Sequence, residues 1–202
     1  KDALSKLKDD EARGATVYVT LEPCSTHGRT GACTEALISA GVSKVVYGAC
    51  DPNPSHSRKA GKILEAAGIR VVTGILEEKC QELIRGFSTV QTLGRPWLIA
   101  KTAMSLDGRI TRPKGEGQWL SGAGAREEVQ QLRTEADAIL TSGETVRRDN
   151  PALTLRGAGI SSEKTQPWRV VMTQQGFDQK DFQIFKDEWK ERTLIFQNQP
   201  KY

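Results

Sequence analysis

The chain has 202 residues, of which 27% are charged and 37% hydrophobic, and its formal net charge is +4 at pH 7. This length suits one large domain or two small ones, and no run of about 18 apolar residues occurs that could span a membrane. Acidic and basic residues are interspersed rather than gathered in a basic block. A small anionic ligand is therefore a better expectation than a nucleic acid.

The start of the chain and its cysteines indicate a compartment. Residues 1–14 are charged and look like part of a helix rather than a signal peptide. Without a secretory signal, Cys24, Cys33, Cys50 and Cys80 are expected to be thiols of a cytoplasmic protein. Both ends of the sequence look abrupt, so we expect the chain to be a fragment of a longer one.

The first half of the chain alternates between strand and helix patterns. Strand-like runs occur at 15–22, 43–49 and 69–74, and helical patterns lie between them at 33–40 and 57–68. This alternation predicts a parallel α/β sheet with right-handed connections.

The helices of this half are expected to bury one apolar face each. In the second helix, this face would be formed by Ala60, Ile63, Leu64 and Ala67. A further helix over 77–92 would carry its apolar residues inward, namely Leu83, Ile84 and Phe87.

A boundary is predicted at Leu93-Gly94-Arg95-Pro96, because proline restricts the residue before it. It divides the chain into segments 1–92 and 93–202. The second segment predicts another α/β unit, with a helix at 121–136 and strands at 96–106, 137–142, 167–174 and 193–198.

The run "EPCSTHGRTGAC" places Cys24 and Cys33 where the first strand ends and a helix begins. A helix N-terminus favours thiolates, which are also zinc ligands, and a catalytic zinc takes three protein ligands and keeps one position open. The two histidines of the chain are His27 and His56, and His27 would be a tight third ligand inside the loop. From these residues alone, a zinc site and a pair of free cytosolic thiols both remain open.

The Glu-Pro-Cys start adds a resemblance. Zinc-dependent nucleobase deaminases carry H-x-E followed by P-C-x-x-C, whereas this chain has P-C-x8-C with "GRT" inside the loop. That longer spacing resembles the bifunctional riboflavin-biosynthesis family, diaminohydroxyphosphoribosylaminopyrimidine deaminase/5-amino-6-(5-phosphoribosylamino)uracil reductase. Further motifs match both halves of that family in order: "VTLEPCS", "DPNP", "KTAMSLDGRI", "GEGQWLS", "LRTEADAILTSGETVRRDNPALTLR" and "RVVMT".

The resemblance implies a cytidine-deaminase-like three-layer α/β/α domain followed by a dihydrofolate-reductase-like α/β domain, both partial. Segment 1–92 would be the zinc-dependent pyrimidine deaminase without its N-terminal part. Segment 93–202 would be the NADPH-dependent reductase without its C-terminal part.

In the first domain, the resemblance makes Cys24 and Cys33 zinc ligands. The family's third ligand is the histidine of an H-A-E motif, whose glutamate shuttles protons. No H-A-E occurs in this sequence, and we expect it upstream of residue 1. Arg29, Asp51 and Asn53 would hold the ribose-phosphate and the ring, although "DPNP" taken alone is more typical of a plain turn.

In the second domain, the resemblance implies two sets of contacts. NADPH would touch Ala103, Trp119, Thr145 and Asp149, and the substrate would touch Gly117, Arg133, Leu153 and Arg156. Two arginines suit a phosphate, which favours charge-assisted and bidentate hydrogen bonds. Without the resemblance, the structural interpretations are favoured: Trp119 as a core residue, Arg133 as a solvated charge and Thr145 as a helix cap.

The implied function is zinc-dependent deamination of 2,5-diamino-6-(5-phosphoribosylamino)pyrimidin-4(3H)-one. NADPH, a co-substrate, would then reduce the ribosyl group of the deaminated product. The resemblance also implies a homodimer or homotetramer. The alternatives are a nucleotide or tRNA deaminase and a non-catalytic nucleotide-binding remnant.

Overall fold

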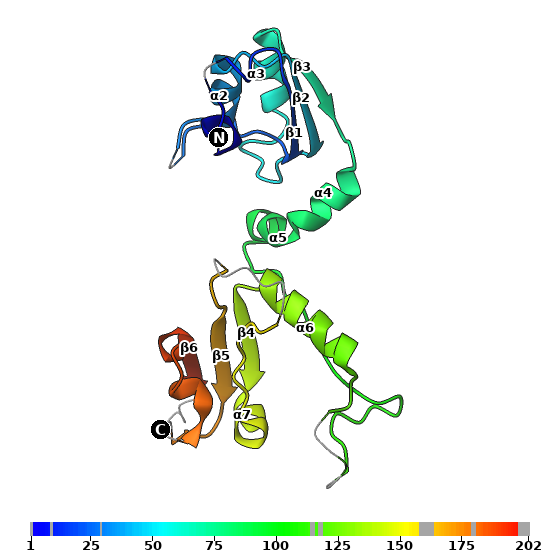
Figure 1. Cartoon of the computed structure of the whole chain (residues 1–202), viewed down its shortest axis with the longest axis vertical. Helices are drawn as coiled ribbons and strands as arrows, with labels where there is room; N and C mark the ends of the chain where they lie inside the picture. The colour runs from blue at the N-terminus through cyan, green and yellow to red at the C-terminus, as the bar shows by residue number, and fades with distance from the viewer. Residues whose placement is uncertain are drawn as a thin grey trace. The chain divides into compact units, whose positions relative to one another are not determined.

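The computed structural model describes residues 2–8, 10–28, 30–113, 116, 119–157, 164–178 and 181–197. The chain forms two compact units, Lys1–Ala100 and Lys101–Tyr202. Each unit contains its own three-stranded parallel sheet (Figure 1). The expected α/β class is therefore confirmed in both halves of the chain.

The first sheet contains β1 (Thr16–Leu21), β2 (Lys44–Ala49) and β3 (Arg70–Thr73), in the spatial order β1-β2-β3. Helix α2 (Cys33–Ser39) connects the first two strands, and α3 (Ala60–Ala66) connects the next two. The short helix α1 (Asp2–Ser5) precedes them. The central strand β2 is an almost continuous apolar run, as expected for a strand covered on both faces.

The core of this unit lies between the sheet and α2 and α3. Val45 and Tyr47 of β2 pack there with Leu37 of α2 and Leu64 of α3. The prediction for α3 was only partly correct. Ala60 and Leu64 are fully buried, whereas Ile63 is 39% exposed and Ala67 is also exposed. Ile63 lies at the margin of the apolar stripe, and Ala67 follows the last residue of the helix.

On the other face of the sheet, α4 (Glu77–Leu83) packs against β2. Strand residues alternate between faces, so Gly48 points away from the core that contains Tyr47, and a Cβ at Gly48 would lie 2.1 Å from Sγ of Cys80 on α4. The absence of a side chain at Gly48 thus lets α4 approach the sheet. Helices on both faces complete the predicted three layers.

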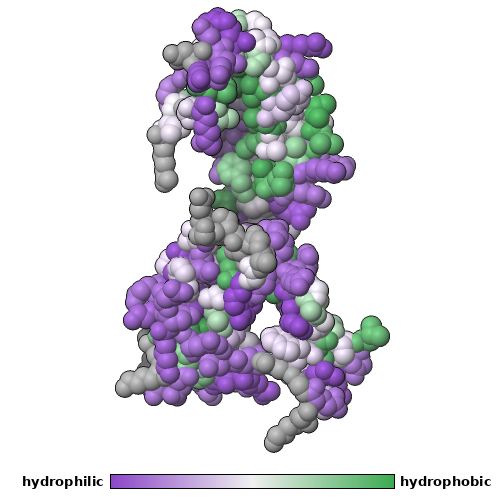
Figure 2. Space-filling view, viewed as in Figure 1, coloured by the Kyte–Doolittle hydropathy of each residue, from purple (hydrophilic) through white to green (hydrophobic). Residues whose placement is uncertain are grey.

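The prediction of a single helix over 77–92 is wrong. The chain forms α4 and a separate α5 (Arg85–Leu93), with Ile84 between them in a non-helical conformation (φ −101°, ψ 10°). Leu83 is 73% exposed and Phe87 is also exposed, so the expected apolar face is not buried. Apolar side chains accordingly appear on the surface of this unit (Figure 2).

The second sheet has the order β4-β5-β6. Its elements are α6 (Ala123–Glu135), β4 (Ala138–Ser142), α7 (Gly143–Asp149), β5 (Trp168–Thr173), the 3-10 helices η2 (Gln183–Phe185) and η3 (Lys190–Arg192), and β6 (Thr193–Gln197). Val146 of α7, Val171 of β5 and Ile184 of η2 form the core. Three phenylalanines pack around it: Phe177, Phe182 and Phe185.

The strand expected over 96–106 does not form. The described residues provide no neighbouring strand for it, and its large apolar side chains, such as Leu98 and Leu106, are exposed. An isolated strand has no ladder partner to satisfy its backbone groups, so apolar composition alone does not produce one. Across the described ranges, no helix combines the length and apolar character that a bilayer crossing requires.

Candidate active sites

The cysteine loop lies between β1 and α2. The backbone N–H of Cys33 donates to Sγ of Cys24 over 3.2 Å, and the N–H of Thr34 donates to the carbonyl of Cys24 over 3.1 Å. Both thiols are free and half-buried. The loop therefore closes on itself and brings Cys24 to the first turn of α2, next to Cys33.

The donor chemistry of this pair fits zinc. Burial raises the pKa of the Cys33 thiol, and the adjacent Cys24 raises it further. A divalent cation between the two sulfurs would counter both effects, because a coordinating thiol is deprotonated. Within the described ranges, no cluster of three or more His, Cys, Asp or Glu side chains could hold a metal ion. A catalytic zinc takes three protein ligands, of which this pair could supply two.

The two histidines of the first unit make other contacts. Nε2 of His27 lies 3.1 Å from a carboxylate oxygen of Glu35 on α2. Nδ1 of His56 lies 3.1 Å from Oγ1 of Thr26, so this contact joins the cysteine loop to the loop that follows β2.

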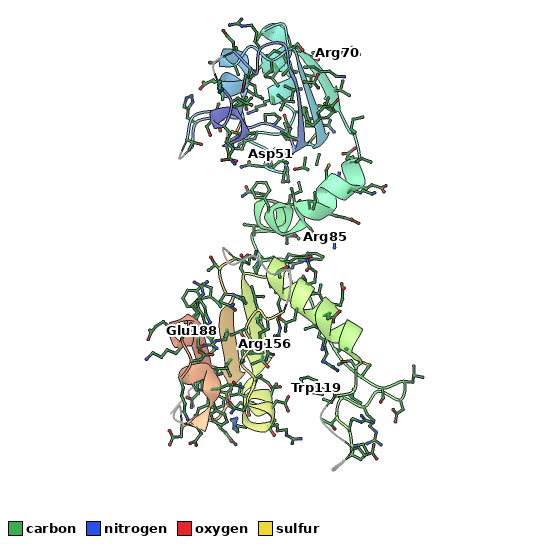
Figure 3. All side chains as sticks on the ribbon, in the orientation of Figure 1. Asp51, Arg70, Arg85, Trp119, Arg156 and Glu188 are labelled. Carbon is green, nitrogen blue, oxygen red and sulfur yellow. The ribbon has the colours of Figure 1, made fainter. Side chains whose placement is uncertain are left out.

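The loop after β2 carries the predicted substrate residues Asp51, which is labelled in Figure 3, and Asn53. Oδ1 of the buried Asp51 accepts the N–H of Asn53 over 2.8 Å, and Oδ1 of Asn53 accepts the N–H of Ser55 over 2.9 Å. The turn interpretation of "DPNP" is therefore correct locally, and both side chains help to form that turn. Arg29 lies outside the described residues.

Sequence reasoning missed Glu22, which is 3% exposed. Its carboxylate accepts backbone N–H groups from Asp51, Arg58 and Ala60 over 3.1, 2.9 and 3.0 Å. The available signal was a glutamate directly after an apolar strand and two residues before a candidate ligand. Acids at strand ends are usually solvated, so this signal was weak.

In the second unit, Arg133 of α6 and Arg156 lie close enough to influence each other. Burial lowers the pKa of Arg133, and the charge of Arg156 lowers it further. Nη1 of Arg133 donates to the carbonyl of Thr154 over 3.1 Å, and the N–H of Arg156 donates to Oε1 of Gln130 over 3.0 Å. Two neighbouring guanidinium groups without an acidic partner among the described residues would favour a bound anion.

The predicted substrate residue Leu153 belongs to the loop between α7 and β5. It is buried, and its φ of 53° is uncommon for a leucine. Such a conformation persists only where the surrounding structure enforces it. Here, Nη1 of Arg169 donates to the carbonyl of the preceding Ala152 over 3.0 Å. Two hydrogen bonds from Gln183 hold Asn150. Nε2 of Gln183 donates to the backbone carbonyl of Asn150, and the backbone N–H of Gln183 donates to Oδ1 of Asn150. Gly117 lies outside the described residues.

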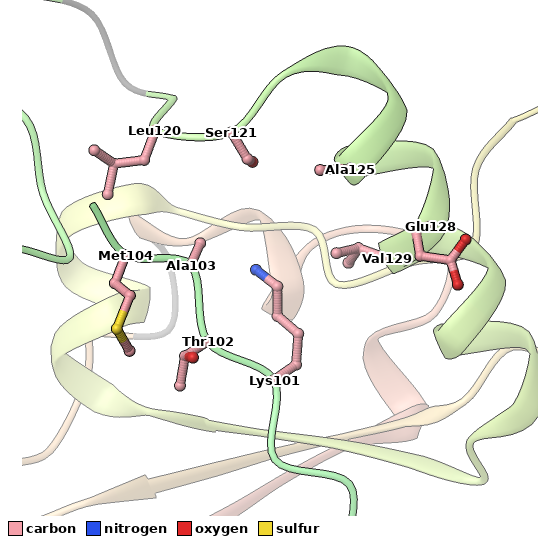
Figure 4. A pocket seen from close by; sticks show the side chains of 9 residues that line it. All are labelled: Lys101, Thr102, Ala103, Met104, Leu120, Ser121, Ala125, Glu128 and Val129. Carbon is pink, nitrogen blue, oxygen red and sulfur yellow. The ribbon is translucent and has the colours of Figure 1, made fainter. Parts of the chain in front are cut away.

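The predicted cofactor residues occupy different settings. Ala103 lines a cavity of about 340 Å³ between the segment after residue 100 and the start of α6, and the side chain of Lys101 reaches into it (Figure 4). Trp119 is 58% exposed, so it is not core filling. The guanidinium of Arg126 lies 5.3 Å from the centre of the Trp119 ring, and Nη1 of Arg112 donates to the carbonyl of Trp119 over 3.3 Å.

Thr145 and Asp149 lie at opposite ends of α7. Ser142 is the N-cap of this helix, because its Oγ accepts the N–H of Thr145 over 3.1 Å. Thr145 is therefore the capped residue rather than the cap, and its own hydroxyl lies 3.0 Å from that of Ser142. Asp149 is exposed as the last residue of the helix.

Two protein families match successive parts of the chain. Residues 1–49 match the cytidine and deoxycytidylate deaminase zinc-binding region, and residues 96–201 match the RibD C-terminal domain. Among individual relatives, the riboflavin biosynthesis protein RibD of Synechocystis is 46% identical over 81% of this chain and 44% of its own length. RibD of Escherichia coli is 41% identical over 84% of this chain and 49% of its own length. The chain thus spans about half the length of these relatives.

Solved structures give the same result. Acinetobacter baumannii RibD superimposes with a TM-score of 0.81 and 38% identity, over 94% of this chain and 53% of its own. The diaminohydroxyphosphoribosylaminopyrimidine deaminase/5-amino-6-(5-phosphoribosylamino)uracil reductase of Thermotoga maritima also has a TM-score of 0.81, with 36% identity over 99% of this chain and 55% of its own. The two expected domain types, cytidine-deaminase-like and dihydrofolate-reductase-like, are confirmed by these matches.

Proposed function

Because this chain belongs to the RibD family, we propose that the complete encoded protein acts in riboflavin biosynthesis with two activities. The deaminase domain, 1–92, removes ammonia from 2,5-diamino-6-(5-phosphoribosylamino)pyrimidin-4(3H)-one. The reductase domain, 93–202, reduces the ribosyl group of 5-amino-6-(5-phosphoribosylamino)uracil with NADPH. The main support is that a thiol pair at a helix start and an arginine pair lie in separate units, in the same chain order as the matched families.

In the deaminase domain, Cys24 and Cys33 would hold zinc, which when bound would activate water for hydrolysis of the ring amine. The chain's own residues do the positioning. Asp51 and Asn53 lie on a loop joined to the cysteine loop through Thr26 and His56, and with Arg29 they hold the substrate. The resemblance assigns the third zinc ligand and the proton-shuttling glutamate to an H-A-E motif, which this sequence does not contain.

In the reductase domain, Arg133 and Arg156 bind the substrate phosphate. Their mutual repulsion is relieved when an anion lies between them. Leu153 and Gly117 contact the rest of the substrate, and the enforced conformation of Leu153 fixes this part of the loop.

NADPH, when bound, supplies the hydride to the ribosyl group. Ala103, Trp119, Thr145 and Asp149 orient it, and the cavity beside Ala103 is one part of its site. The protein's contribution is to position both molecules and to exclude water.

The assembly and the compartment are also proposed. The protein is a cytoplasmic homodimer or homotetramer that binds small molecules. Free cysteines throughout the described chain support a reducing compartment. Light scattering of the complete protein measures the assembly, and a monomer would contradict it.

The test of function is NADPH oxidation by the complete encoded protein, with the diaminopyrimidinone ribosyl phosphate as the only substrate. We expect oxidation accompanied by ammonia release. If oxidation occurs only after the deaminated compound is supplied, the deaminase half of the proposal is wrong. If neither compound supports oxidation, both halves are wrong.

A further inference from the structure

Glu22 connects the two loops of the proposed deaminase site. It follows β1 directly, and its own N–H extends the ladder by donating to the carbonyl of Ala49 over 2.8 Å. Two residues later the chain reaches Cys24. The backbone of Glu22 is therefore part of the sheet, close in sequence to the candidate zinc ligand.

Among the described residues, the partners of the Glu22 side chain all come from one segment, 51–60. Oε2 accepts the N–H groups of Asp51 and Arg58, and Oε1 accepts that of Ala60, over 2.9 to 3.1 Å. These donors lie at the start of the loop after β2, near its end, and at the first residue of α3. One carboxylate therefore fixes both ends of the loop that carries Asp51 and Asn53.

The chemistry of the contact requires an ionised or strongly polar acceptor. A carboxylate accepts hydrogen bonds and donates none, and within the described residues Glu22 forms no ion pair. Burial removes water from the carboxylate and from the N–H groups of Asp51 and Ala60, so these groups depend on one another for hydrogen bonding. An amide at position 22 would keep one oxygen and turn an NH2 group toward at least one N–H.

We propose that Glu22 is a positioning residue of the deaminase site, which sets the place of Asp51 and Asn53 relative to the zinc ligand Cys24. This inference rests on the proposed function. Glu22 itself touches neither zinc nor substrate. Its removal is expected to raise the KM of deamination by about tenfold or more, because a hydrogen bond to a charged group is among the stronger ones.

The test compares Glu22→Gln with Glu78→Gln in the complete encoded protein. Glu78 is an exposed carboxylate on α4 and serves as the matched control. Four readouts are taken: the steady-state kinetics of deamination (its KM and kcat), zinc per chain, reductase kcat/KM on the deaminated compound, and hydrogen exchange at the amides of Asp51, Arg58 and Ala60.

In Glu22→Gln, we expect a raised KM, faster exchange at these amides, unchanged zinc content and unchanged reductase activity. The control should match the wild type in all four. A purely structural role would lower thermal stability without moving KM, so a folded Glu22→Gln protein with wild-type KM would overturn the inference. If Glu22→Gln does not fold, Glu22→Asp replaces it. That variant keeps the charge but is one methylene too short to reach all three donors, and a folded Glu22→Asp protein with wild-type KM has the same meaning.

The wild type separates this inference from the function on which it rests. A wild-type protein that does not deaminate overturns the proposed function, and the inference with it. A wild-type protein that deaminates, beside a Glu22→Gln variant with the same KM, overturns the inference alone.

Discussion

The two units hold their site loops with buried side chains of opposite charge. In the first, Glu22 accepts three backbone N–H groups from the loop that runs from Asp51 to Ala60. In the second, Arg169, only 1% exposed, donates to the carbonyls of Ala152 and Ile184 and to Oγ1 of Thr193. Arg169 also forms a bidentate pair with Asp187, at 2.6 and 2.9 Å.

The sign of each buried charge matches the backbone groups that lack partners in the loop it holds: N–H groups favour an anion, and carbonyls favour a cation. The loop held by Glu22 leads into the start of α3, where N–H groups have no partner within the helix. The positive end of that helix helps to stabilise an anion that has no cationic partner among the described residues. The loop held by Arg169 presents carbonyls instead, and the guanidinium requires Asp187 for neutralisation in the core.

The largest expected effect is a loss of activity in one unit that leaves the activity of the other unit unchanged. Cys33→Ser in the complete encoded protein should lose zinc and deamination, because serine does not replace a thiolate ligand. The reductase activity on the deaminated compound should remain, since its proposed residues lie in the other unit. Metal analysis and the two activity assays measure this result. A folded variant that lost both activities would contradict two independent sites.

Arg169→Met should destabilise the second unit strongly. The substitution leaves Asp187 without its cationic partner and the carbonyl of Ala152 without its side-chain donor, and breaking a buried pair in this way costs about 3–5 kcal/mol. Urea unfolding measures the change. Arg148→Met is the control, because Arg148 pairs with Glu144 at the surface. Equal losses in the two variants would show that burial of the Arg169 pair has no special importance.

The stability of the second unit should depend on pH through the ion pair between Arg169 and Asp187. Hydrogen bonding from Arg169 lowers the pKa of Asp187. The ion pair therefore contributes its full stability above the pKa of an unfolded aspartate, about 3.9, and loses it as the pH falls through the lower folded pKa. Asp187→Asn should be less stable than the wild type at neutral pH, and the difference should shrink in acid. A difference in urea midpoint that stays constant down to the lowest accessible pH would refute this.

The smallest effect is expected at Glu144. Hydrogen bonding from Arg148 lowers the pKa of Glu144, and the two side chains are 2.6 Å apart. Both are exposed, and exposed ion pairs often contribute nothing measurable to stability. Glu144→Gln should leave the urea midpoint unchanged. A loss as large as that of Arg169→Met would show that hydrogen-bond length, rather than burial, governs the comparison.

The sequence by itself determined the parallel strands and the family. After Lys44, β2 is an apolar run, and such a run indicates a buried central strand because that position tolerates few polar residues. The cysteine spacing and the ordered motifs indicated the RibD family before any contact was known. The site residues carried over from that resemblance, such as Arg133 and Arg156, stay predictions.

Only the tertiary structure decided the ends of α4, the absence of a strand at 96–106 and the roles of Glu22 and Arg169. Whether Leu83 or Leu98 is buried depends on a partner surface that the local pattern does not specify. The partners of Glu22 lie 29 to 38 residues away in sequence. A charged residue at a strand end looks solvated until folding removes its water and replaces it with backbone hydrogen bonds.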